Sequence, residues 1–233
     1  MFQKAVKAKS FLRLGIAGPT GSGKTKSALR IATGISQAMR GEKIAVIDTE
    51  HGRASYYSDE FKFDTAQMHK PYEIDKYIRA IKEAQDEGYK ILVIDSLTHA
   101  WQELLEEVEK LGKTKYRNNS FRAWSEGTPK QNKFVEAFLG YEGHLIATMR
   151  SKMEYALEKD EKTGKNVVNK LGMGIEQRKG LEYEFLLFME GTTDHYFTVS
   201  KDNTGKFQDK IIEKPDEEMG KELYEWLNTE GSK

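Results

Sequence analysis

The most constraining feature of this chain is the segment GPTGSGKT at residues 18–25. It follows a short apolar segment at 12–17 and leads into residues 24–40, whose apolar side chains have helical spacing. A strand, a glycine-rich turn and a helix in this order form the context of a phosphate-binding loop. The glycines let successive backbone N–H groups face phosphate oxygens, and the helix N-terminus adds a favourable dipole. The segment therefore predicts an α/β fold with a phosphate site, the alternative being a chance glycine-rich loop.

Apolar and amphipathic segments alternate through the rest of the first half. The pattern predicts strands at 43–48, 90–95 and 144–149, and helices at 71–87, 98–111 and 130–139. The last helix is expected to begin after Pro129. Because the strands are apolar throughout and alternate with helices, we expect a mostly parallel central sheet that helices cover on both faces.

The second half has a different character. A protruding hairpin is expected over 153–171, where Lys162, Thr163 and Gly164 separate two strand-like segments. Two further strands are expected near 183–190 and 195–201 as an antiparallel extension, followed by an acidic helix at 217–227. We expect one domain over 1–233, with its core at about 10–150, the hairpin and added strands at 151–205 and the acidic end at 206–233.

Composition excludes several classes of function. The 37 basic and 37 acidic side chains cancel, so net charge gives no argument about nucleic acid. The absence of cysteine excludes disulfides and thiolate metal sites. No apolar segment approaches the roughly 20 residues of a membrane span. We therefore expect a cytoplasmic protein with no membrane partner.

The loop residues have expected roles in binding a nucleoside triphosphate, ATP, with Mg²⁺. Lys24 is expected to reach the β- and γ-phosphates, and Thr25 to offer its hydroxyl to the ion. Asp95 ends an apolar strand and is the expected carboxylate for the ion, the alternative being a helix cap. The nucleotide-binding residues of the loop are Gly18, Pro19, Thr20, Gly21, Ser22, Gly23, Lys24, Thr25 and Lys26.

Hydrolysis of a triphosphate also needs a group that orients the attacking water. Ser96 follows Asp95, so no acid stands beside the metal ligand. Glu50 follows the strand that ends at Asp48, and a carboxylate at this edge of a neighbouring strand can reach the γ-phosphate. Glu50 is the candidate general base, the alternative being a solvated loop acid.

These motifs carry a resemblance to a known family. GPTGSGKT, VIDTEHGRASYY and ILVIDS resemble the RecA recombinase core. TPKQNKFVEAFL, HLIATMRSKMEY, GIEQRKGLEYEF and TVSKDN are similar to small RecA-like ATPases of bacteriophages that act in DNA recombination, repair and single-strand annealing. The resemblance runs from residue 12 to about 205. It implies a RecA-like core, a DNA-stimulated ATPase with ATP between subunits, and a location in the bacterial cytoplasm if a phage encodes the protein.

The resemblance also implies roles for individual residues. Glu50 would be the catalytic base, and Tyr57 would stack on the adenine unless it is a plain core tyrosine. Lys201 fills the first place of a Lys-x-Lys pair that reaches the neighbouring subunit's γ-phosphate, whereas Asn203 fills the second and removes a charge. An exposed strand-end lysine is the alternative for Lys201. Thr148 or Arg150 would sense the γ-phosphate.

Two basic stretches are expected to bind single-stranded DNA. Residues 112–133 interleave cations with aromatic side chains, as sequence-tolerant single-strand binding requires, and residues 150–180 follow the sensor strand. In both stretches a solvated loop is the alternative. The candidate DNA-binding residues are Lys113, Lys115, Arg117, Arg122, Trp124, Arg150, Lys152, Arg178 and Lys179.

The expected partners are single-stranded DNA, further copies of the chain in a ring or filament, and a single-strand-binding protein. Two other classes of function stay open. A P-loop kinase of a small molecule would need an acceptor pocket and no DNA. A nucleotide-dependent scaffold or loader would bind a protein partner and scarcely hydrolyse ATP.

Overall fold

The computed structural model describes residues 4, 6–159 and 166–229, with the backbone alone given for 153–159 and 166–172. In this part of the chain nine strands form one sheet in the order β3-β2-β4-β5-β1-β7-β8-β9, with β6 paired to β5 outside this path. Neighbours from β3 to β7 run parallel, which confirms the predicted α/β class. The strands are β1 (Arg13–Gly18), β2 (Ile44–Asp48), β3 (Asp64–Gln67), β4 (Ile91–Asp95), β5 (His144–Lys159), β6 (Asn166–Ile175), β7 (Leu187–Gly191), β8 (Tyr196–Asp202) and β9 (Ile211–Glu213).

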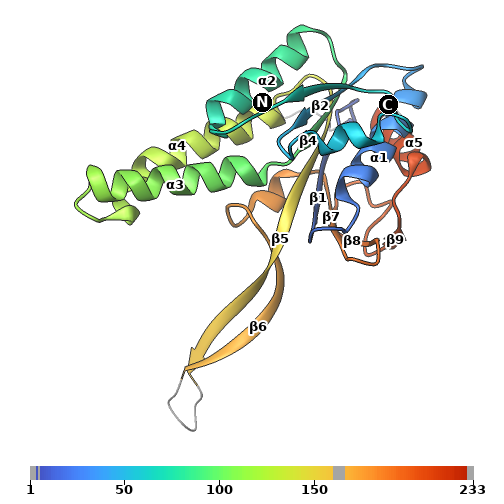
Figure 1. The fold of residues 1–233 in the computed structure, drawn as a ribbon. Helices are drawn as coiled ribbons and strands as arrows, with labels where there is room; N and C mark the ends of the chain where they lie inside the picture. Colours follow the sequence, from blue (N-terminus) through green and yellow to red (C-terminus); the bar gives the residue numbers. More distant parts are fainter. Residues whose placement is uncertain (1–3, 5, 160–165, 230–233) are drawn as a thin grey trace.

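Helices cover both faces of this sheet, as the alternation of segments predicts (Figure 1). One face carries α1 (Lys24–Ala38) and α5 (Glu217–Asn228). The other carries α2 (Ile74–Asp86), α3 (Thr98–Thr114) and α4 (Ser120–Leu139). Among the described residues, none of these helices combines the length and the apolar character that crossing a bilayer requires.

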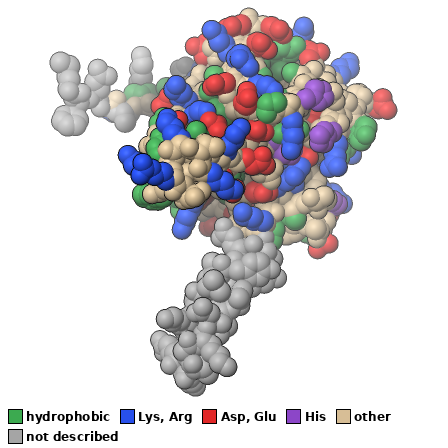
Figure 2. All heavy atoms as spheres, turned by 60° about the vertical axis from the view of Figure 1, so that its left-hand side comes forward, with side chains coloured by type: hydrophobic (Ala, Val, Ile, Leu, Met, Phe, Trp, Pro, Cys, Tyr) green, Lys and Arg blue, Asp and Glu red, His purple; other side chains and the backbone are tan. Residues whose placement is uncertain are grey.

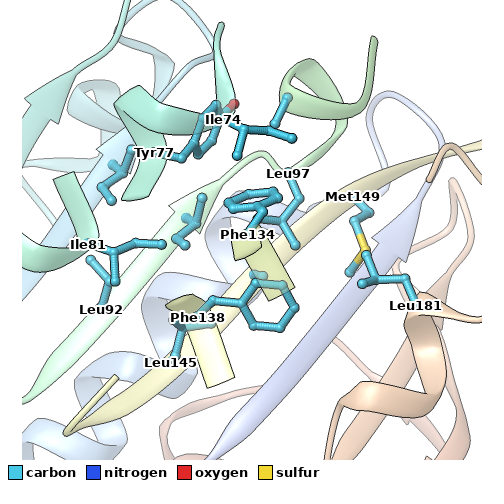
Figure 3. Close-up of a cluster of buried hydrophobic side chains, with 14 of the residues drawn as sticks. Ile74, Tyr77, Ile81, Leu92, Leu97, Phe134, Phe138, Leu145, Met149 and Leu181 are labelled. Carbon is cyan, nitrogen blue, oxygen red and sulfur yellow. The ribbon is translucent and has the colours of Figure 1, made fainter. Parts of the chain in front are cut away.

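Alternating side chains explain why the central strands are apolar throughout. Leu92 and Ile94 of β4 pack toward α2, α3 and α4, whereas Ile91 and Val93 pack toward α1 and α5. Figure 3 shows the first cluster, in which aromatic rings from α2 and α4 lie over the sheet. Because each face has its own core, the register of the strands is fixed and their carboxyl ends meet at one edge.

The segment 112–133 differs most from its prediction. The helix expected from residue 130 begins at Ser120, and Pro129 lies inside it. The N-terminal cap is Asn119, whose side chain accepts the Arg122 N–H at 2.9 Å. Since α3 extends to Thr114, the expected DNA-binding loop is instead largely a pair of packed helices. Gly127 permits their close approach, because a Cβ there would lie 2.5 Å from the side chain of Val108.

The strand predicted at 144–149 is also longer than expected. β5 continues to Lys159 and pairs antiparallel with β6, so that the two extend away from the sheet in Figure 1. This pairing confirms the predicted hairpin. The expected turn at Lys162, Thr163 and Gly164 lies outside the described residues.

The C-terminal extension is antiparallel only in part. β7 is parallel to β1, and β8 and β9 then add antiparallel. The acidic helix α5 packs against α1 through two glycines. A Cβ at Gly34 would lie 1.9 Å from the Glu217 carbonyl oxygen, and one at Gly220 would lie 2.2 Å from the Ile31 carbonyl oxygen.

Candidate active site

The phosphate-binding loop lies between β1 and α1, as its sequence predicts. Gly21 and Gly23 have φ values of 83° and 86°, a region that suits glycine. A Cβ at Gly18 would lie 2.5 Å from the Ser22 hydroxyl oxygen, so the curled loop also requires this glycine. The Lys24 ammonium donates to the Pro19 carbonyl at 2.8 Å and therefore lies folded over the loop.

Asp95 lies next to the loop, where a metal ligand is expected. The Thr25 hydroxyl donates to one carboxylate oxygen of Asp95 at 2.6 Å, and the Thr148 hydroxyl donates to the other. Thr148 belongs to β5, which lies between β4 and β1 in the sheet. Burial raises the pKa of Asp95, whereas the two hydroxyl donors oppose this shift. Thr148 thus helps to position Asp95, and its expected role as a phosphate sensor stays a prediction.

Glu50 lies beside Asp95 and is held by Arg150. The Arg150 guanidinium donates to both carboxylate oxygens of Glu50, at 2.8 and 2.7 Å through one nitrogen and at 3.1 Å through Nε. The His99 ring nitrogen lies 3.8 Å from the same carboxylate. Burial alone would raise the pKa of Glu50, but the hydrogen bonds and charge of Arg150, with smaller effects of His99 and Arg53, hold the pKa below its ordinary value.

A buried aspartate shapes the turn that follows Glu50. Asp48 accepts the Glu50 N–H at 2.7 Å and the Ala54 N–H at 3.1 Å. These bonds fold the chain into the short helix η1 (Arg53–Tyr57). Tyr57 consequently lines the same cavity as the phosphate loop, with the Lys26 ammonium 5.7 Å from its ring centre.

The loop, Asp95 and Glu50 surround one cavity of about 600 Å³. Its wall also contains residues that no sequence motif identifies. His195 follows β7, and a Cβ at Gly23 would lie only 3.2 Å from its ring. Lys214 follows β9, and its N–H donates to the His195 carbonyl at 2.9 Å. Because both residues come from the C-terminal strands, only the folded sheet brings them to the loop.

Lys201 does not line this cavity. It lies opposite Phe188 in the β7–β8 pair, and its ammonium donates to the Tyr183 carbonyl. Phe188 is level with Gly15 of β1, whereas the phosphate loop begins beyond Gly18. A contact between Lys201 and a phosphate therefore stays a prediction, and it would require the phosphate of another copy.

The residues present fit a nucleotide with magnesium. Ser22 has a fully buried hydroxyl without a partner among the described residues, inside a loop of backbone N–H groups. In the described part of the chain, no group of three or more His, Cys, Asp or Glu side chains is placed to hold a metal. Thr25 and Asp95 nevertheless provide oxygen ligands, and Mg²⁺ typically takes one or two carboxylates together with substrate phosphates. These two residues would hold the ion.

The structure places the candidate DNA-binding residues in several different surroundings. Lys113 pairs with Glu109 and Lys115 with Glu126, both at 2.6–2.7 Å. Arg150 belongs to the active-site cavity, and Lys152 and Arg117 lie elsewhere. A second hollow is lined by the remaining set, Arg122, Trp124, Arg178 and Lys179.

Surface charge over the side toward which α3 and α4 extend is mixed. Figure 2 shows basic side chains interspersed with acidic ones there, rather than one uninterrupted basic surface. Whether an individual cation has an ion-pair partner is therefore a better indication of a DNA site than the overall charge of this side of the molecule.

Comparisons with known proteins agree with this geometry. The structure is similar to the crystal structure of a KaiC-like protein from the hyperthermophilic archaeon Pyrococcus horikoshii, with a TM-score of 0.50, 16% sequence identity and coverage of 89% of each chain. At this identity the similarity concerns the fold. A search of curated protein sequences gives no match. Residues 10–221 match the family described as "AAA domain". The chain therefore belongs to this family of nucleotide-binding P-loop ATPase domains.

Proposed function

We propose that this protein hydrolyses ATP with magnesium and does so in response to single-stranded DNA, in recombination, annealing or repair. The observation that carries the ATPase part is one cavity that combines three elements: the phosphate loop, the Thr25–Asp95 pair and the Glu50 carboxylate. A small-molecule kinase requires the first two elements but has no need for a base directed at water.

Each group of residues in the cavity has its own role in ATP hydrolysis. The loop N–H groups and Lys24 bind the β- and γ-phosphates, and burial lowers the pKa of Lys24. Bound magnesium would neutralise phosphate charge between Thr25 and Asp95. Glu50 would orient the attacking water and accept its proton, and Arg150 keeps Glu50 ionised by lowering its pKa. Tyr57 provides a ring against which the adenine can stack.

Two observations support the DNA part of the proposal. The sequence resembles phage recombination ATPases across most of its length, and a group of basic and aromatic residues lines a hollow beside α4. The site would be completed by a second copy, because Lys201 lies away from its own cavity. ATP would then lie between subunits, and assembly on DNA would control turnover.

Comparing ATPase rates with and without single-stranded DNA tests the proposal. We expect stimulation by DNA, and we expect Glu50→Gln to lower turnover by about 10²–10⁴-fold while nucleotide still binds, as for loss of a general base. Glu109→Gln is the matched control, since Glu109 is a surface acid paired with Lys113 outside the cavity. Unchanged turnover in Glu50→Gln would exclude Glu50 as the base. A lack of both stimulation and DNA binding at low salt would exclude the DNA part and favour a kinase or scaffold.

A further inference from the structure

A groove runs along α4 on the side away from the active-site cavity. Two hollows, of about 840 and 370 Å³, share Arg178 and Lys179 in their walls and therefore lie next to each other. We call this the α4 groove and define it by Phe121, Arg122, Trp124, Gln131, Arg178 and Lys179. Its far wall is the segment that leads into the short helix η2 (Leu181–Glu184).

The cations of the α4 groove differ from three lysines that lie on or beside α3 and α4. Lys113, Lys115 and Lys130 each form an ion pair with a glutamate of α3 or α4. Arg122, Arg178 and Lys179 form no ion pair with any carboxylate of the described residues. Among the described residues, the wider hollow therefore has three unpaired cations and no acidic side chain in its wall, and it suits an anionic group. The narrower hollow also contains Glu136 and Glu184, so it suits a neutral group such as a base.

Aromatic rings lie beside these cations. Trp124 stacks on Trp101 with 5.6 Å between ring centres and 28° between planes. The Arg178 guanidinium lies 5.9 Å from the Trp124 ring. Phe121, one turn before Trp124 on α4, is 89% exposed. An exposed apolar ring next to fixed cations provides a stacking surface that water does not favour.

The third feature of the α4 groove is the buried side chain of Gln131. Its side chain is only 2% exposed, and neither its amide nitrogen nor its amide oxygen has a partner among the described residues. It lines the narrower hollow. Leaving a buried donor and acceptor unpaired is costly, so a bound group that pairs with both would recover that cost.

We infer that the α4 groove binds a single strand of DNA, with its phosphates at Arg122, Arg178 and Lys179, a base stacked on Phe121, and the Gln131 amide paired with a base edge. This inference rests on the proposed response to DNA and assigns its site. The groove also connects to the active site. The Gln177 amide donates to the Leu97 carbonyl at 2.7 Å, two residues after Asp95, and the Glu176 N–H donates to the Arg150 carbonyl at 2.7 Å.

Fluorescence anisotropy measures the binding of a labelled oligodeoxythymidylate over a range of salt concentrations. It separates the contribution of base stacking from that of the phosphate contacts. Phe121→Ala should weaken binding by about fivefold or more, the effect of losing one stacked base, without changing the salt dependence. Phe121→Trp should restore binding. The double variant Arg178→Ala/Lys179→Ala should lower the slope of log K against log salt by about 1.4, since each phosphate contact to a single strand contributes about 0.7.

Two further variants test the assignment independently of folding. Lys113→Ala/Lys115→Ala also removes two positive charges, but from paired lysines outside the groove, and it should leave both affinity and slope unchanged. Gln131→Met keeps the side-chain volume, and it should weaken DNA binding although it removes two unpaired buried atoms. Thermal unfolding and nucleotide binding report whether each variant is folded.

The outcomes distinguish the groove from the proposed function. If the unmodified protein binds no single-stranded DNA, the DNA part of the function fails and the groove assignment fails with it. If it binds DNA and the groove variants bind equally well, only the groove assignment is overturned. Loss of self-association in Phe121→Ala with unchanged DNA affinity would instead identify the groove as a contact between copies.

Discussion

The pKa of Glu50 is subject to two opposing effects, its burial and the positive groups that surround its carboxylate. Burial would raise its pKa, but the bidentate contact with Arg150, together with the nearby His99 and Arg53, lowers the pKa below its ordinary value. A general base acts only in its ionised form, so this balance sets the acidic limit of activity. Arg150 is a positioning residue in this sense, because it acts on the reaction through Glu50.

Replacing Arg150 with glutamine should therefore raise the pKa of Glu50. The ATPase rate would begin to fall at a higher pH on the acidic side of its profile, because the base would become protonated sooner. A pH–rate profile measures this shift independently of the absolute rate. Arg79→Gln is the matched control, since Arg79 is an exposed arginine of α2 that does not line the cavity. An acidic limb that does not move in Arg150→Gln would contradict the assigned pairing.

Replacing Gln131 should have opposite effects on two quantities, the free energy of unfolding and the affinity for DNA. Its two amide atoms are buried without partners, which costs about 1–3 kcal/mol for an unsatisfied group. Gln131→Met should therefore raise the free energy of unfolding by about 1–3 kcal/mol, measured by urea denaturation. Asn132→Met, at the next position of α4, is the control for a general gain from an apolar residue. A less stable Gln131→Met would mean that the amide has a partner in solution.

At the residue scale the sequence predicted the residues that belong to short motifs of defined spacing, and little beyond them. Lys24, Thr25, Asp95 and Glu50 could be identified because each belongs to a short segment whose spacing has a physical purpose. His195 and Lys214 could not, because they reach the cavity only through the register of β7, β8 and β9. Arg150 was predicted to sense phosphate or bind DNA, and its contact with Glu50 depends on the order of three strands.

Among the elements, those with continuous apolar patterns were predicted well and those with mixed patterns were not. α4 contains Gly127 and Pro129 close together near its middle, so its pattern suggested a loop up to that proline. The helix persists because Asn119 caps it and Trp124 packs on α3. Tertiary packing thus overrode local propensity. β3 is exposed along its length and has no apolar alternation, so nothing in its sequence indicated a strand.

The contact between α1 and α5 gives a prediction about elements. A Cβ at Gly220 would lie 2.2 Å from the Ile31 carbonyl oxygen, which is backbone and cannot rotate away. Gly220→Ala should therefore separate the two helices and cost about 1–3 kcal/mol by overpacking, despite the better helix propensity of alanine. Thermal or urea unfolding measures the loss, with the exposed Glu222→Ala as the control. Because α5 follows Lys214 closely, nucleotide binding should weaken as well. An unchanged stability would show that the helices are less closely packed than described here.

For the whole molecule, the parallel sheet is what assembles the site. The order β2-β4-β5-β1 places Glu50, Asp95, Arg150 and the phosphate loop along one edge, and the register aligns Asp48 with Asp95 and Gly18 with Arg150. The sequence predicted that the carboxyl ends of the strands share an edge. It did not predict which strands are neighbours, and that order decides that Thr148 holds Asp95 and that Arg150 reaches Glu50.

Lys201 tests whether the site is complete in one chain. It lies on β8 away from its own cavity, so a role in catalysis requires the phosphate of a neighbouring copy. Lys201→Ala should then lower the ATPase rate of the assembled protein and leave nucleotide binding intact. Loss of a charge that stabilises the transferring phosphoryl group costs about 10³–10⁵-fold in the best-known cases, and a lysine with Asn203 beside it should give less.

A mixing experiment separates this role from a structural one. Lys24→Ala retains Lys201 but lacks a working phosphate loop, whereas Lys201→Ala retains the loop. If the contact is made between copies, mixing the two inactive variants on single-stranded DNA should restore part of the activity, because some interfaces combine an intact loop with an intact lysine. If Lys201 acts within its own chain or only supports Tyr183, no mixture can form a complete site and the activity stays at the level of the separate variants.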